Sequence, residues 1–86
     1  MRRSIDDYPF DPSDLPPGDT DDFARLSWAV AIADDYEDAE PRVVLTVEEV
    51  GRAGEGLVAH LAPAQVRRLR TALHDALREL GEAPGA

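Results

Sequence analysis

The chain has 86 residues, 43% of them hydrophobic, and a formal net charge of −9 from 18 acidic and 9 basic side chains. This length allows one domain, and the hydrophobic fraction is ordinary for a globular protein and too high for full disorder. The absence of cysteine and of any apolar run of about 18 residues excludes disulfides, thiolate metal sites and a membrane-spanning helix.

Residues 1–22 are predicted to be an acidic, proline-rich and flexible arm. They contain 4 prolines and 7 aspartates, and both proline and the repulsion between like charges oppose regular structure. Apolar side chains spaced among the aspartates are typical of a short binding motif, although the arm would also serve as a simple solubilising tail. The candidate partner-binding residues are Asp6, Asp7, Tyr8, Phe10, Asp11, Asp14 and Leu15.

The negative charge is concentrated in the first half of the chain. Residues 1–40 carry 12 acidic and 3 basic side chains, so that 3 − 12 = −9, whereas residues 41–86 carry 6 of each. This distribution opposes binding to nucleic acid or anionic lipid and favours a partner protein with a basic surface. Because no apolar run follows Arg2 and Arg3, we expect no secretory signal, no membrane contact and a cytoplasmic location.

Residues 23–81 are predicted to form one small α+β domain, followed by a loose tail over residues 82–86. Alternating large apolar side chains predict strands over residues 24–32, 42–49 and 57–61, and the short connections favour an antiparallel meander. The side chains expected to face the core are Leu26, Trp28, Val30, Val43, Leu45, Val47, Leu57 and Leu61.

One amphipathic helix is expected between Pro63 and Gly81, because proline suits a first helical turn and glycine a left-handed stop. Ala62 offers no side-chain oxygen and is a poor cap for this helix. The apolar stripe at helical spacing is Val66, Leu69, Leu73, Ala76, Leu77 and Leu80. The predicted architecture is therefore β-β-β-α, with the helix packed on one face of a three-stranded sheet and an acidic disordered arm in front.

The other face of the predicted sheet carries small and mildly apolar side chains. These are Ala29, Ala31, Val44, Thr46 and Val58. The polar residues flanking them are Arg25, Arg42, Glu48 and His60. A face in contact with water is usually more polar, so we predict that this face forms the interface of a homodimer or of a heteromeric complex. The alternative, an ordinary sheet that leaves its alanines in water, stays open.

Arg67, Arg70 and Arg78 form a candidate basic face along one side of the predicted helix. Such a face suits contacts with phosphates, but the net charge of −9 opposes them. We therefore expect these arginines to pair with the acidic arm, which would mask them, or with Asp75 and Glu79.

No pattern in the sequence predicts catalysis or a cofactor. The acidic run over residues 34–40 lacks the spacing of a calcium-binding loop, and His60 and His74 lie on different predicted elements. The serines have no nucleophile motif around them, and no helix opens within the glycine-containing turn after the second strand. We therefore expect a protein that is not an enzyme and that holds no metal.

Two segments resemble small uncharacterised proteins of actinobacteria and their phages. The first runs from Arg42 to Glu49, and the second from Leu61 to Leu69, followed by Ala72 and Leu73. In those proteins a strand or hairpin precedes a helix that starts at leucine, threonine and proline, and this chain has Ala62 in place of the threonine. The resemblance implies the coarse fold and a bacterial source, because that group has no known activity.

Together these features predict a non-catalytic protein-interaction module that serves as a small regulatory or accessory subunit. The arm would bind a basic partner surface, and the small-residue sheet face would bind a partner or a second copy. Two alternatives remain. In the first, the carboxylates mimic nucleic acid and inhibit a protein that binds DNA or RNA; in the second, the helix arginines bind nucleic acid weakly.

Overall fold

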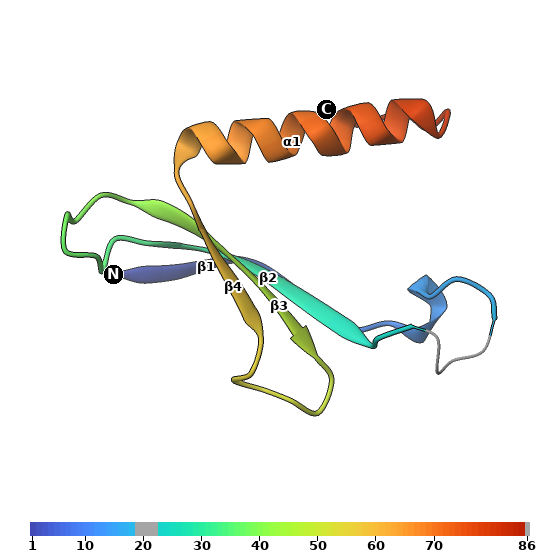
Figure 1. The fold of residues 1–86 in the computed structure, drawn as a ribbon, viewed down its shortest axis with the longest axis horizontal. Helices are drawn as coiled ribbons and strands as arrows, with labels where there is room; N and C mark the ends of the chain where they lie inside the picture. Colours follow the sequence, from blue (N-terminus) through green and yellow to red (C-terminus); the bar gives the residue numbers. More distant parts are fainter. Residues whose placement is uncertain (19–22, 86) are drawn as a thin grey trace.

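The structure, a computed structural model, describes residues 1–18 and 23–85. Its elements are the strand β1 (Arg2–Tyr8), a 3₁₀ turn η1 (Pro12–Asp14), the strands β2 (Leu26–Ala33), β3 (Arg42–Glu49) and β4 (Leu57–Leu61), and the helix α1 (Pro63–Glu79). The four strands form one antiparallel sheet in the order β1-β2-β3-β4 (Figure 1). The α+β class and the C-terminal helix are confirmed, and the prediction of only three strands is wrong.

The additional strand, β1, lies in the segment predicted to be a disordered arm. β1 pairs with β2 from Arg2 opposite Ala33 to Tyr8 opposite Trp28, and the register shifts around Ile5. Every residue of β1 is exposed, so the strand is held by its backbone ladder rather than by burial. Residues 19–22, also part of the predicted arm, lie outside the described residues.

The two remaining hairpins are fixed by local backbone requirements. The connection from β2 to β3 contains Ala39, whose φ of 56° lies in the left-handed region that alanine rarely adopts. In the connection from β3 to β4, a Cβ atom added at Gly56 would lie 2.7 Å from the carbonyl oxygen of Val47. Glycine is therefore required at Gly56 because the turn passes directly against β3.

The sheet has two different faces. The register places one set of large apolar side chains together, and we call it the open face: Trp28, Val30, Leu45, Val47 and Leu57. The opposite set is the small-residue face: Ala29, Ala31, Val44, Thr46 and Val58. Among the described residues, the buried ones are Ala31, Ala33 and Val44, with Tyr36 packed against them, and all lie on the small-residue side. The core thus lies on the opposite face from the one predicted.

The helix α1 does not cover the open face. It contacts only β3 and β4, and Figure 1 shows it diverging from the sheet after it leaves the end of β4. Leu73, in the middle of its apolar stripe, is 59% exposed, and Leu57 on the open face is 82% exposed. The predicted packing of the stripe over the sheet is therefore absent from this chain. No helix in the described part of the chain has the length and apolarity needed to span a bilayer.

Candidate functional site

The acidic residues of β1 and η1 are held by local hydrogen bonds. Asp11 caps η1, and its Oδ1 accepts from the backbone N–H of Ser13 at 3.0 Å and from the Ser13 hydroxyl at 2.9 Å. These bonds favour the carboxylate and lower the pKa of Asp11. Tyr8 donates its hydroxyl to Asp14, which raises the pKa of Tyr8. The segment after β1 is thus folded back onto the strand rather than extended.

The ring of Tyr8 also stacks on Trp28 of the neighbouring strand. The two ring centroids are 5.1 Å apart and the rings are within 10° of parallel. This pair lies where Tyr8 and Trp28 face each other across the β1–β2 ladder. Cross-strand aromatic pairs of this kind stabilise a sheet, so Tyr8 fixes the end of β1 against β2.

A groove of about 430 Å³ opens at the same end of β1 and β2. Its lining residues come from β1, β2 and β3 and from the residue after β1: Asp7, Tyr8, Pro9, Ser27, Trp28, Ala29, Thr46 and Glu48. The register places Asp7 opposite Ala29 and Glu48 opposite Ser27. Two carboxylates and no basic side chain therefore line the hollow, and the lining residues that share their sheet face, Ser27, Ala29 and Thr46, are small.

This groove joins residues from two separate predictions. Asp7 and Tyr8 were predicted as partner-binding residues of the arm, and Ala29 and Thr46 as interface residues of the sheet face. Sequence reasoning did not bring them together, because it did not place residues 2–8 in the sheet. The alternating apolar pattern that identified the other strands is absent there, so no signal indicated the contact.

The remaining residues of the small-residue face differ in burial. Ala31 and Val44 are buried within the chain, and Val44 is only 1% exposed. Val58 on β4 is 49% exposed. One end of this face is therefore closed by its own chain, and the other end is open at the groove.

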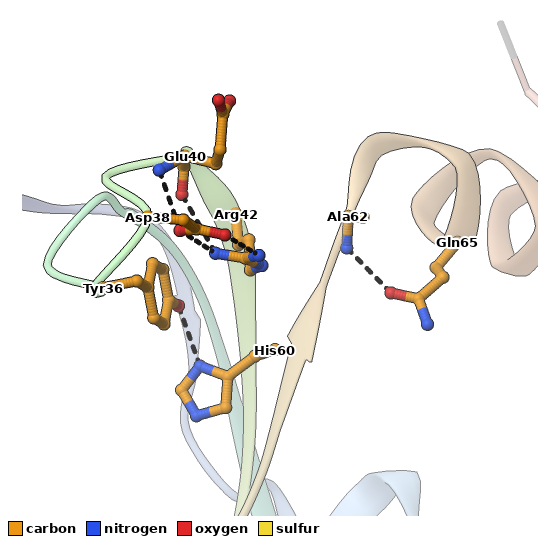
Figure 2. A network of polar contacts seen from close by, with 7 residues as sticks. All are labelled: Tyr36, Asp38, Glu40, Arg42, His60, Ala62 and Gln65. Atoms are coloured by element: carbon orange, nitrogen blue, oxygen red, sulfur yellow. Dashed lines mark hydrogen bonds and ion pairs between the residues drawn. The ribbon is translucent and has the colours of Figure 1, made fainter.

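The closed end is covered by Tyr36 from the loop between β2 and β3. The Tyr36 hydroxyl and Nδ1 of His60 on β4 are hydrogen-bonded at 2.8 Å, with the two rings edge to face (Figure 2). The guanidinium carbon of Arg42 lies 4.7 Å from the centre of the Tyr36 ring. Arg42 in turn holds Asp38 through two bonds of 2.9 and 2.6 Å. This pairing holds the pKa of Asp38 well below its usual range.

Much of the acidic run over residues 34–40 is therefore neutralised within the chain. Asp38 is paired with Arg42, and the amino group of Met1 contacts both Asp34 and Asp35. Asp34 and Asp35 raise the pKa of the Met1 amino group, and this amino group lowers the pKa of Asp34, because each group favours the charged form of the other. The hairpin loop consequently presents less free negative charge than its sequence suggests.

The two other predicted arm residues, Phe10 and Leu15, lie at a second, smaller hollow of about 280 Å³. It is lined by Phe10, Pro12, Leu15, Pro16, Pro17, Gly18, Phe23 and Arg25. Phe10 and Leu15 thus cluster with prolines and with Phe23. They lie apart from the groove, since the two hollows share no lining residue.

No family model matches the chain, and neither a curated protein nor a solved structure matches it. The resemblance to small actinobacterial and phage proteins therefore stays a prediction. Function has to be inferred from the residues and from their geometry.

The basic face of α1 is exposed. Arg67, Arg70 and Arg78 form no ion pair with any group within residues 1–18 and 23–85. The expected masking of these arginines by the acidic arm is thus not seen in the described residues. The ion pairs that were also expected with Asp75 and Glu79 are not seen there either, and Asp75 instead contacts His74 at 3.2 Å.

The two histidines do not share a site in the described part of the chain. His60 is bonded to Tyr36 and His74 to Asp75, and the two histidines lie on different elements. Within the part of the chain that the structure covers, no three histidine or carboxylate side chains gather as metal ligands would. Among the described features, the groove lined by Asp7 and Glu48 therefore has the most clearly defined binding chemistry, because it offers two carboxylates.

Proposed function

We propose that the chain is a non-catalytic protein-interaction module, a small regulatory or accessory subunit that binds a basic segment of a partner protein. The observation that supports this best is the groove on the small-residue face, because Asp7 and Glu48 line it and no basic side chain does. A carboxylate attracts a guanidinium or ammonium group and accepts charge-assisted hydrogen bonds from it.

The shape of the groove suits a long basic side chain. Ser27, Ala29 and Thr46 are small, so they leave room between the two carboxylates. An arginine or lysine stem is apolar and can lie along such residues while its charged end reaches a carboxylate. The net charge of −9 adds attraction at longer range, which speeds association and makes it sensitive to salt.

The test is the binding of a fluorescently labelled oligo-arginine peptide, followed by anisotropy at low and at physiological ionic strength. The double variant Asp7→Asn/Glu48→Gln should weaken binding by about tenfold or more, because both acceptors in the groove lose their charge. Point variants are preferable to deletion of residues 1–22, since that deletion would remove β1 from the sheet.

The matched control is Glu79→Gln/Glu82→Gln, which removes the same charge at the other end of the chain. This variant should bind the peptide almost as tightly as the natural sequence. Equal losses in both double variants would mean that binding follows net charge alone, and the groove would then have no specific role.

A nucleic-acid role is the alternative, and the exposed arginines Arg67, Arg70 and Arg78 favour it over mimicry by the carboxylates. Mimicry requires acids at regular spacing on a rigid surface, whereas Asp34 and Asp38 are paired within the chain. A mobility-shift assay at low salt separates the two functions, because a shift abolished by charge reversal in α1 would indicate binding through the helix.

A further inference from the structure

We propose that the open face and the apolar stripe of α1 bind a second copy of this chain, so that the helix of each copy covers the open face of the other. This inference deepens the proposed function. It rests on that function in one respect, which is that the protein is an interaction module. It assigns self-association to the open face and leaves the groove, on the other side of the sheet, for a different partner.

The surface of the single chain is too large for a compact protein of its mass. The accessible area is 7015 Å², whereas a compact monomer of 9.4 kDa exposes about 5,000 Å². The radius of gyration is 15.2 Å, against about 12 Å expected for 86 residues. The excess is about 2,000 Å² per chain, or about 4,000 Å² for two, which lies within the range of obligate homodimers.

Part of the exposed surface is apolar and lies on two elements. On the sheet it includes Trp28 and Leu57, and on the helix it includes Leu69, Leu73 and Leu80. Contiguous exposed apolar surface of this kind is rare on a monomer and marks a binding site.

The connection between the sheet and the helix is short and restricted. Only Ala62 separates the end of β4 from Pro63, where α1 begins. The backbone of Ala62 is extended, and its N–H donates to Oε1 of Gln65 at 2.8 Å (Figure 2). Proline at the start of α1 restricts the backbone further. These features favour the direction in which α1 diverges from its own sheet (Figure 1).

A second copy matches both unpartnered surfaces at once. α1 has 17 residues and is about 25 Å long, and β2 and β3 have 8 residues each and are about 26 Å long. A two-fold axis places each helix on the other sheet, so that both helices and both open faces are covered by the same contact. A partner of a different sequence would need to supply a sheet and a helix of its own.

The first experiment measures the mass of the full chain by light scattering and sedimentation at protein concentrations from about 1 to 300 µM. We expect a dimer of 2 × 9.4 = 18.8 kDa. A mass of 9.4 kDa at every concentration would overturn the inference, whether α1 then folds onto its own sheet or awaits a different protein. Assemblies larger than a dimer would overturn it as well.

The second experiment decides which face forms the contact. Leu57→Glu on the open face and Leu73→Glu on α1 should each raise the dissociation constant of the dimer by about 100-fold or more, since each change occurs twice per dimer. The matched controls are Val58→Glu, on the adjacent residue and the opposite sheet face, and Thr71→Glu, on the opposite side of α1. Both should remain dimeric.

A dimer that Val58→Glu dissociates and Leu57→Glu does not would place the contact on the small-residue face and refute the proposal. Cross-linking guards against variants that fail to fold, because the chain has no cysteine of its own. A mixture of Leu57→Cys and Leu73→Cys chains should form a bismaleimide-linked pair, and a mixture of Val58→Cys and Thr71→Cys chains should not. No linkage in the first mixture would refute the crossed arrangement.

The outcome is separable from the proposed function. A chain that is monomeric but still binds the oligo-arginine peptide keeps the proposed function and loses this inference. If the chain is a dimer and its Asp7→Asn/Glu48→Gln variant binds the peptide as tightly as the natural sequence, the inference stands. The proposed role of the groove is then wrong.

Discussion

Replacing Val44 with alanine should destabilise the chain more than any comparable change on the same face. Val44 is 1% exposed and lies in the small buried cluster beneath Tyr36. The change removes two methyl groups, worth about 1.6 kcal/mol in transfer free energy, and leaves a cavity that raises the loss to about 2–3 kcal/mol. In a chain of this size, that corresponds to a fall of about 8–24 °C in Tm.

The control is Val58→Ala, which deletes the same atoms from the same face of the neighbouring strand. Val58 is 49% exposed, so the expected loss is below about 1 kcal/mol. Both variants are compared with the natural sequence by urea unfolding at one fixed protein concentration, using the fluorescence of Trp28, the single tryptophan. If Val58→Ala proves as destabilising as Val44→Ala, the face is covered along its whole length and the assigned core is wrong.

Three further changes test the hairpins. Ala39→Gly should raise the unfolding free energy by about 0.5–1 kcal/mol in a urea titration, because glycine adopts the left-handed backbone at φ 56° without strain. Gly56→Ala should lower that free energy by about 1–3 kcal/mol, since the new methyl group would lie 2.3 Å from Cγ of Glu48; an unchanged midpoint would contradict the close approach. Asp38→Asn should lower the thermal midpoint at neutral pH. The pKa of Asp38 is depressed by Arg42, so its contribution is complete above the ordinary carboxyl pKa and is lost as the pH falls toward the depressed value. The gap between the Tm of the natural sequence and that of the variant should therefore narrow in acid, and a gap that is constant with pH would rule out this pairing.

The strands β2, β3 and β4 could be predicted because large apolar side chains recur at every second residue and turn residues separate the segments. The predicted ranges 42–49 and 57–61 coincide with β3 and β4, and the helix starts at Pro63 as expected. Periodicity is a local signal, and it identifies an element whenever one face differs from the other. The missing side-chain cap at Ala62 was also predicted, although the bond from its N–H to Gln65 was not.

β1 could not be predicted from the same signal. The register shift around Ile5 interrupts the alternation, and all its side chains are exposed, so no apolar pattern marks it. Its formation depends on backbone pairing with β2, which is a tertiary contact. The groove was missed for the same reason, because Asp7 reaches it only when β1 is in the sheet.

The position of the helix could not be predicted either. The spacing of Leu69, Leu73 and Leu77 shows which side of α1 is apolar, but periodicity does not tell what covers that side. The prediction was that the large apolar side chains of the same chain's sheet cover the apolar side of the helix. In the structure α1 diverges from the sheet after the single-residue connection at Ala62, and the direction of the helix there depends on backbone geometry rather than on composition.

The outer strand β1 has a consequence for solubility. An unpaired strand edge is a template for joining other chains into fibrils, and proteins protect such edges with charges and bulges. β1 carries Arg2, Arg3, Asp6 and Asp7, and its register is interrupted around Ile5. An incoming strand would meet charged side chains of both signs and a broken hydrogen-bond ladder. The acidic residues that suit a basic partner thus also protect this edge from amyloid-like growth.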